Sequence, residues 1–230
     1  DSAGEPRQLL NPEREIQDWL AALDCMRQHQ SVDAEQICLW GTSFSGGLVT
    51  VAAARDGNVK CIVAQCPMMD GLASVLAVIG YGGLGQGLKL TLHGMLDLGR
   101  RAIGLSPHYI GSAGHPGEAA AMTAPDCWDG YTYLIPEGVP NKVAAGIAVT
   151  LPLFRPVTKA SKVTCPALVL ICEKDSVAPA SAAEKAATAM AHAQVRRYPV
   201  GHFDVYRGDA YEQSLKDQPA FLEQHLTVTG

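Results

Sequence analysis

The segment 36–55 constrains the fold of this chain more strongly than any other. Its first five residues, QICLW, are apolar and partly β-branched, which is typical of a buried strand. GTSFSGG follows at once, and LVTVAAAR then has the composition of an apolar helix. A strand that passes through a tight glycine-rich turn directly into a helix predicts an α/β fold with a parallel sheet.

The rest of the chain continues this alternation. An amphipathic helix is expected over Ile16–Met26, after Asn11 and Pro12, a capping residue and a proline suited to a first helical turn. The other predicted elements are strands at Val59–Gln65, Ala167–Cys172 and Val195–Pro199, and helices at about 180–193 and at Tyr211–His225. The predicted fold class is therefore α/β, with a mostly parallel sheet flanked by helices.

Residues 68–157 interrupt the alternation. They are rich first in glycine and apolar residues, then in Pro, Trp and Tyr. A length of 230 residues suits one domain with an inserted part. We therefore predict an α/β core formed by residues 1–67 and 158–230, with residues 68–157 as a mostly helical cap inserted between strands.

Charge and cysteine content exclude several classes of protein. The formal net charge is −5 and no Lys/Arg cluster occurs, so we expect no nucleic-acid partner. No run approaches the roughly 20 apolar residues of a membrane-spanning helix, and the first residues lack a signal-peptide pattern, so we expect no membrane partner. The seven cysteines are odd in number and lack zinc-site spacing, which favours a reducing, cytoplasmic location and no metal site.

Ser43 is the candidate nucleophile, because a serine needs an exposed position and a neighbouring base to react. Gly41 and the pair Gly46-Gly47 remove side chains where strand and helix would crowd, as in the G-x-S-x-G nucleophile elbow. Ser45 occupies the place of the last glycine of that motif. Ser45 is the alternative nucleophile, but a side chain at 43 would then obstruct the turn.

The partners of a nucleophilic serine follow in the order Ser, Asp, His. Asp175 comes directly after the strand in LVLICEKDSVAP, and His202 follows the short strand in RRYPVGHFDVY. Asp175 could instead cap a helix, with Glu173 or Asp204 as the acid. The other histidines have neither the required order nor the strand context; they are His29, His93, His108, His115, His192 and His225.

The strings LWGTSFSGG, VAQCPMMDG, PALVLICEKDSVAP and YPVGHFDVY resemble the α/β-hydrolase superfamily, particularly bacterial serine esterases near the dienelactone-hydrolase and acyl-peptidase-like groups. The resemblance covers nearly the whole chain and implies the α/β-hydrolase fold. It places an acyl-transfer triad on Ser43, Asp175 and His202, in agreement with the reading of the residues themselves. The backbone N–H of Phe44 is the matching oxyanion donor, and no cofactor is required.

The chain departs from the superfamily pattern at its start, where members usually have further strands and a loop that provides a second oxyanion donor. GEPRQLL looks like the loop just ahead of the first helix, so the fold is expected to lack its N-terminal strands. Loss of one donor typically lowers the rate by about a hundredfold to a thousandfold, which predicts weak activity. An exposed sheet edge and core face predict a homo-oligomer.

Taken together, these features predict a serine carboxylesterase that hydrolyses small, short-chain acyl esters. A thioesterase, amidase or peptidase with the same triad is the alternative among enzymes, since cap shape decides the substrate. A non-catalytic α/β-hydrolase-like binding protein is the alternative from another class. Substrate-binding residues stay open, because Asp70, Trp128 and the tyrosines of the cap fit core packing or ordinary surface as well as a pocket.

Overall fold

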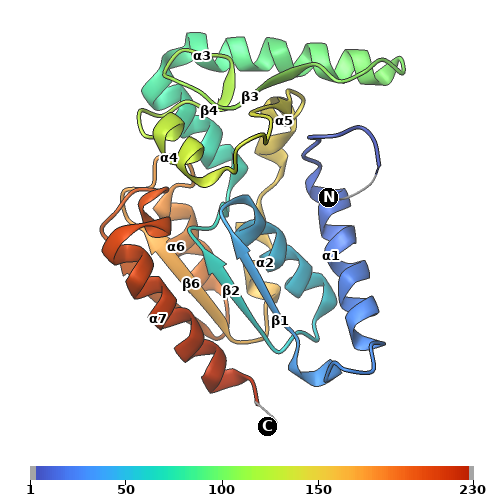
Figure 1. The fold of residues 1–230 in the computed structure, drawn as a ribbon, viewed down its shortest axis with the longest axis vertical. Helices are drawn as coiled ribbons and strands as arrows, with labels where there is room; N and C mark the ends of the chain where they lie inside the picture. Colours follow the sequence, from blue (N-terminus) through green and yellow to red (C-terminus); the bar gives the residue numbers. More distant parts are fainter. Residues whose placement is uncertain (1–3, 228–230) are drawn as a thin grey trace. The chain divides into compact units, whose positions relative to one another are not determined.

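The computed structural model describes residues 4–227, which form two compact units. The sheet unit comprises Pro12–Asp70 and the chain from Arg155 onward, and the α3 unit comprises the described residues up to Asn11 together with Gly71–Phe154. The predicted cap, 68–157, begins and ends three residues outside the second segment of the α3 unit. Residues 4–11, which the sequence analysis assigned to the core, group with the α3 unit instead. Figure 1 shows the elements of both units along the chain.

A four-stranded parallel sheet forms the centre of the sheet unit. Its strands are β1 (Cys38–Thr42), β2 (Cys61–Gln65), β6 (Ala167–Cys172) and β7 (Ala193–Tyr198), in the spatial order β1-β2-β6-β7. All neighbouring strands pair in parallel. The predicted parallel sheet is confirmed, and because parallel strands share one direction, the loops after them meet at one edge.

The boundaries of β1 differ from the prediction. β1 begins at Cys38 and continues through Thr42, whereas the sequence predicted a strand over 36–40. The residues before it, Ala34–Gln36, form the 3₁₀ turn η1, and the side chain of Asp33 caps that turn by accepting from the backbone N–H of Glu35. The capped turn occupies the first residues of the predicted strand, so β1 starts later; it ends at Thr42, the residue before Ser43.

Four helices belong to the sheet unit: α1 (Pro12–Arg27), α2 (Phe44–Asp56), α6 (Ala180–Ala189) and α7 (Gly208–His225). α2 packs on β1 and β2, α1 packs on α2, and α7 packs on β2 and β6 (Figure 1). Trp40 of β1 donates to Gln218 of α7, which in turn donates to Gln65 of β2. These side-chain hydrogen bonds tie the last helix to the two strands that precede the functional site.

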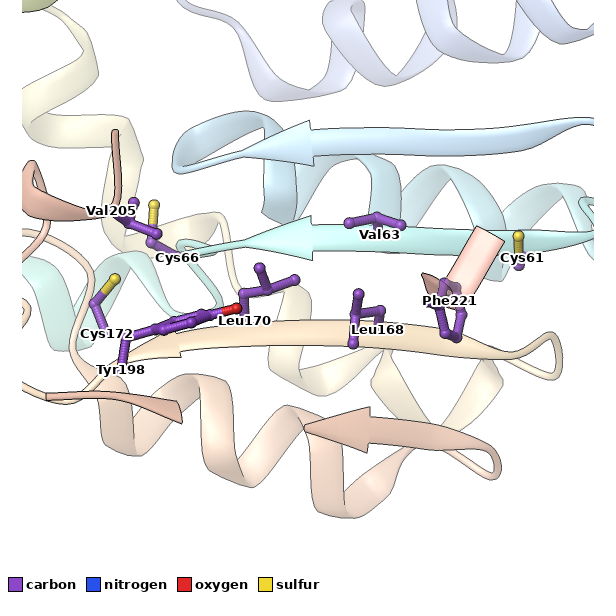
Figure 2. Close-up of a cluster of buried hydrophobic side chains, with 9 residues drawn as sticks. All are labelled: Cys61, Val63, Cys66, Leu168, Leu170, Cys172, Tyr198, Val205 and Phe221. Carbon is purple, nitrogen blue, oxygen red and sulfur yellow. The ribbon is translucent and has the colours of Figure 1, made fainter. Parts of the chain in front are cut away.

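Apolar side chains of β2 and β6 form the core beneath α7. Val63, Leu168 and Leu170 belong to one cluster, in which Phe221 of α7 lies near Leu168 and Tyr198 of β7 lies near Leu170 (Figure 2). Every residue of β2 and β6 is buried, because helices cover both faces of the sheet. The apolar runs that predicted these strands therefore reflect burial on two sides.

All seven cysteines are free thiols, and four of them are buried, among them Cys61, Cys66 and Cys172 in the core of Figure 2. The contact with Cys66 and burial raise the pKa of the Cys172 thiol above its ordinary value. A protonated, buried thiol behaves as a small apolar residue. The four buried cysteines thus contribute to packing.

The α3 unit contains more strand than predicted. Its helices are α3 (Gly71–Ala102), α4 (Cys127–Leu134) and α5 (Ile147–Thr150), and its strands are β3 (Tyr109–Ala113), β4 (Ala120–Met122) and β5 (Val143–Ala144). The strands form a small mixed sheet in the order β4-β3-β5. The expectation of a mostly helical cap was therefore incomplete, because strands of two to five residues are too short to show a clear periodicity.

The helix α3 packs on the small sheet through one face. Leu90 of α3 contacts Ile110, Val143 and Ile147, which together form the core of this unit. Asp97 is fully buried in α3 and accepts hydrogen bonds from the backbone N–H groups of His108 and Gly146 as well as from Arg101. A buried carboxylate with three donors fixes α3 to the segments around β3 and α5.

Asp56, at the end of α2, forms an ion pair with Arg27 of α1, and the contribution of this pair to the stability of the protein can be tested. The two side chains form a bidentate pair with N–O distances of 2.7 Å. The hydrogen bonds from Arg27 lower the pKa of Asp56, so the stabilisation is complete above the unfolded pKa of about 3.9 and is lost as the pH falls through the lower folded pKa. We expect Asp56→Asn to lower the free energy of unfolding by about 1 kcal/mol near pH 7.

Chemical denaturation across the pH range measures this effect. The difference between wild type and Asp56→Asn should be constant from pH 5 to 7 and shrink below about pH 4. Asp18→Asn, an exposed carboxylate on α1, is the matched control and should change stability by less than about 0.5 kcal/mol. An equal difference at acid and neutral pH would contradict the assigned role of the ion pair.

Candidate active site

Ser43 lies at a sharp turn between β1 and α2. Its backbone has φ 54° and ψ −121°, a conformation that a residue with a side chain rarely adopts. The backbone N–H of Ser43 donates to Gln65 of β2 at 2.9 Å, and its carbonyl accepts from Gly46 and Met68. Hydrogen bonds to the neighbouring strand and to the first turn of α2 therefore hold the strained residue in place.

Glycine is required on both sides of this turn. A Cβ atom on Gly41 would lie 2.4 Å from the carbonyl oxygen of Ser45, and one on Gly46 would lie 2.6 Å from the Cβ of Pro67. Both distances are too short for real atoms, so a side chain at either position would force β1, α2 or the loop after β2 apart. Ser45 replaces the usual last glycine of the motif, and the helix α2 forms with a serine at that position.

His202 connects the serine to a carboxylate. Its Nε2 lies 2.9 Å from the Oγ of Ser43, and its Nδ1 lies 2.6 Å from the Oδ2 of Asp175. Asp175 follows β6 and His202 follows β7, so three loops at one edge of the sheet bring the residues together. The structure thus joins the three residues that the sequence singled out, across separations of 159 and 27 positions.

Backbone donors orient the carboxylate. The Oδ1 of Asp175 accepts hydrogen bonds from the N–H groups of Val177 and Ala178 at 2.8 and 2.6 Å, which leaves Oδ2 directed at His202. The side chains of Asp175 and His202 are 1% and 3% exposed. Exclusion of water strengthens the electrostatic interaction between the carboxylate and any positive charge on the imidazole.

The alternative acids have other partners. Asp204 forms an ion pair with Arg207 and accepts from the backbone N–H of Gly201, and the hydrogen bonds from Arg207 lower its pKa. Glu173 is exposed, and its backbone N–H donates to the carbonyl oxygen of Tyr198. Neither carboxylate has a hydrogen bond to His202 among those resolved, so the geometry favours Asp175.

The alternative histidines lie elsewhere. His93 and His108 stack on each other in the α3 unit, and His115 packs against Trp128 there. His29 accepts from the backbone N–H of Ser31 after α1, and His225 packs on Phe221 in α7. Among the described residues, only His202 bonds to a serine hydroxyl.

The sequence analysis missed a group of side chains behind the imidazole. Tyr206 packs edge-on against His202, and its hydroxyl bonds to the Oγ1 of Thr42 at 2.5 Å and to the Sγ of Cys66 at 3.2 Å. Burial raises the pKa of Tyr206, so the hydroxyl stays protonated. Thr42 precedes Ser43, and Tyr206 lies four residues after His202 in YPVGHFDVY, but only the fold makes them neighbours.

Two further predicted residues have clear positions. Phe44 is the first residue of α2, so its backbone N–H lies at the positive end of that helix beside Ser43. Asp70 forms a bidentate ion pair with Arg155 within the sheet unit, which gives it a structural role. No group of three or more His, Cys, Asp or Glu side chains that could hold a metal occurs within residues 4–227.

Comparison of the chain with known proteins identifies its family. Residues 7–86 match the model of the prolyl oligopeptidase family. The quorum-quenching protein AidA of Acinetobacter baumannii (strain MDR-ZJ06) is 35% identical over 99% of this chain and 74% of its own length. The crystal structure of the α/β hydrolase GrgF from Penicillium sp. sh18 aligns over 97% of this chain and 75% of its own, with a TM-score of 0.73 and 22% identity. The chain belongs to the α/β-hydrolase superfamily.

Further similar proteins are a solved structure and a thiohydrolase. The structure of DcsB in complex with a substrate analogue gives a TM-score of 0.78 at 21% identity, over 98% of this chain and 77% of that chain. The thiohydrolase aneE of Aspergillus aculeatus is 40% identical over 70 residues, which is 30% of this chain and 22% of its own length. The predicted α/β-hydrolase fold is confirmed, and the chain is a hydrolase by family.

Gly41→Ala tests the packing of the turn. The added methyl group would overlap the backbone of Ser45, so we expect the free energy of unfolding to fall by at least about 2 kcal/mol. Gly80→Ala is the matched control, because its methyl group would meet no atom within 4 Å in α3 and should stabilise the helix by about 0.5–1 kcal/mol. Thermal and urea unfolding measure both variants, and a Gly41→Ala protein as stable as wild type would contradict this account.

Proposed function

We propose that the protein is a serine hydrolase that cleaves carboxylic esters through an acyl-enzyme formed on Ser43. The observation that supports this proposal is the continuous chain of hydrogen bonds from the Oγ of Ser43 through the imidazole of His202 to Asp175. A hydroxyl becomes a good nucleophile when an oriented base can accept its proton. The arrangement has the order and the roles of a Ser-His-Asp triad.

The proposed reaction has two acyl-transfer steps. The Oγ of Ser43 attacks the ester carbonyl while its proton passes to the Nε2 of His202. His202 then donates that proton to the departing alkoxide, which leaves as the alcohol and gives the acyl-serine. Water attacks the acyl-serine with His202 again as base, and the carboxylic acid and free Ser43 are released. Asp175 keeps Nδ1 protonated and stabilises the imidazolium in both steps.

The backbone N–H of Phe44 is the proposed oxyanion donor. It belongs to the residue after the nucleophile and opens α2, so its dipole and that of the helix favour the negative oxygen of the tetrahedral intermediate. The positive φ of Ser43 supports this role, because the turn presents the hydroxyl and the next amide together. Neither a metal nor an organic cofactor takes part in these steps.

Small acyl esters are the proposed substrates. The match to the quorum-quenching protein AidA supports a low-molecular-weight substrate, since its 35% identity extends over nearly the whole chain. The proposed reaction applies to an open-chain ester and to a ring ester, because the carbonyl carbon of both undergoes the same attack. We therefore place short-chain esters first and include a lactone as a test of ring substrates.

Thioester hydrolysis is the second candidate, on a specific ground. Three relatives named as thiohydrolases match about 30% of this chain at 37–40% identity, among them the proteins from Arthrinium phaeospermum and Eupenicillium brefeldianum. The same triad serves, and the leaving group is a thiolate in place of an alkoxide. A matched pair of acetyl oxygen and sulfur esters distinguishes the two reactions directly.

Ser43→Ala and Ser45→Ala test the proposal as a matched pair. We expect the turnover of p-nitrophenyl acetate, butyrate and octanoate to fall at least about a thousandfold in Ser43→Ala and to change little in Ser45→Ala. A fluorophosphonate probe should label wild type and Ser45→Ala but not Ser43→Ala. Labelling that disappears with Ser45 instead would refute Ser43 as the nucleophile, and a wild type with neither labelling nor turnover would indicate a binding protein.

Asp175→Asn tests the second half of the triad. The amide keeps the shape of the carboxylate but favours the wrong imidazole tautomer, so we expect kcat to fall by roughly 10⁴-fold. Asp204→Asn is the control, because Asp204 pairs with Arg207 and should retain near wild-type kcat. The same assays on an acetyl thioester, a γ-lactone and a peptide p-nitroanilide then rank ester, thioester and amide cleavage. Faster cleavage of the anilide than of the esters would overturn the ester assignment.

A further inference from the structure

The solvent-facing side of α3 is more apolar than its buried side. Leu84, Leu88 and Leu92 follow at intervals of four, so they lie on one face of the helix, and they are 80%, 61% and 62% exposed. Met95 and Leu96 continue this face, and Ile103 follows directly after the last residue of α3; each is more than half exposed. We call these six residues the α3 stripe. Soluble proteins seldom expose so continuous an apolar row without a function in binding.

The opposite side of α3 holds two buried polar side chains, Gln86 and Asp97. Gln86 is buried and donates to the carbonyl of Glu118, and the buried carboxylate of Asp97 accepts from Arg101, His108 and Gly146. These contacts, with Leu90 in the core, fix the rotation of the helix. The α3 stripe therefore faces outward because the inner face has partners that the stripe cannot replace.

The charges around the stripe are basic. Between residues 84 and 103 the helix contains Lys89, Arg100 and Arg101, whereas its one acidic residue, Asp97, is buried. Lys89 and Arg100 lie beside the stripe on the helical wheel and donate only to carbonyl or hydroxyl oxygens in the resolved hydrogen bonds. Their positive charge is therefore not neutralised by an acidic residue of the same helix face.

We propose that the α3 stripe docks on an anionic lipid surface. An apolar face bordered by Lys and Arg is the pattern of helices that lie in the membrane interface, with leucines among the acyl chains and cations at the lipid phosphates. The stripe lies on the part of α3 that follows Gly83, where the backbone is non-helical (φ 75°, ψ 171°) and the helix is kinked. By length and composition alone, Gly71–Ala102 is long and apolar enough to cross a membrane. It lies on the surface instead, because its inner face is bound to β3, β5 and α5 within the α3 unit.

A second copy of the chain fits these observations less well. An antiparallel pairing of two α3 stripes about a twofold axis would place Lys89 and Arg100 of both helices along the same edge, with no acidic side chain on either face to offset the repulsion. An anionic headgroup layer offers the opposite charge along the whole helix. The expectation of no membrane partner rested on the absence of a membrane-spanning run and of a signal-peptide pattern. Neither criterion records which face of α3 is exposed.

Vesicle flotation of the full chain tests this inference. We expect the protein to float with vesicles of equimolar phosphatidylcholine and phosphatidylglycerol, and more weakly with phosphatidylcholine alone. Leu88→Glu with Leu92→Glu should reduce flotation by roughly tenfold or more for each leucine, the fold-change that corresponds to burial of one such side chain. Leu215→Glu, an equal change at an exposed leucine of α7, should float like wild type.

A second pair of variants tests whether Lys89 contributes to binding of anionic vesicles. Lys89→Gln should weaken binding to the anionic vesicles by about fivefold and leave binding to phosphatidylcholine unchanged. Lys185→Gln, at an exposed lysine of α6, should have no effect on either. Far-UV circular dichroism and thermal unfolding verify that each variant is folded, which we expect because every changed side chain is exposed.

The outcomes separate clearly. No flotation of wild type with anionic vesicles, or equal flotation of wild type and the double leucine variant, would overturn the inference. A wild-type dimer in sedimentation analysis that becomes monomeric in the double leucine variant would also overturn it, in favour of a second copy on the stripe. Flotation requires no turnover, so this result and the outcome of the hydrolase assays are independent.

Discussion

The strained backbone of Ser43 is the constraint on which the rest of the site depends. A residue with φ near 54° is unfavourable by itself, and it persists here because β2 accepts its N–H while Gly46 and Met68 bond to its carbonyl. Gly41 gives the room for β1 to approach α2 so closely. The cost of this strain, of order 1–3 kcal/mol, is offset by sheet pairing and helix packing on both sides of the turn.

The parallel sheet brings Ser43 within hydrogen-bond reach of His202, and His202 within reach of Asp175. Since all four strands run in the same direction, the residues after β1, β6 and β7 meet at one edge, and Ser43, Asp175 and His202 need only short loops to reach one another. The backbone N–H groups of Val177 and Ala178 fix the carboxylate, and Tyr206 packs against the imidazole from behind. Loops that begin at rigid strands thus fix the orientation of the Asp175 carboxylate and the His202 imidazole.

In the α3 unit, polar side chains are buried and apolar side chains are exposed along the same helix. Its helix α3 buries the side chains of Gln86 and Asp97 beside Leu90, and it exposes the leucines of the α3 stripe. The three donors to Asp97 make this orientation stable, because a buried carboxylate is tolerated only when its oxygens are bonded. An outward apolar face with basic borders then remains available for a lipid surface.

The sequence by itself determined the parallel strands β1, β2, β6 and β7 and the helices packed on them, because buried parallel strands are continuous apolar runs. It also singled out Ser43, Asp175 and His202, because they follow strand ends in that order. It left the start of β1 two residues early, since capping by Asp33 is a local side-chain effect, and it missed β3, β4 and β5, whose few residues show no period. Only the tertiary structure decided that Tyr206 reaches Thr42 and that the leucines of α3 face outward. Both depend on contacts between segments far apart in the chain, and a one-dimensional pattern does not record which partners a side chain finds.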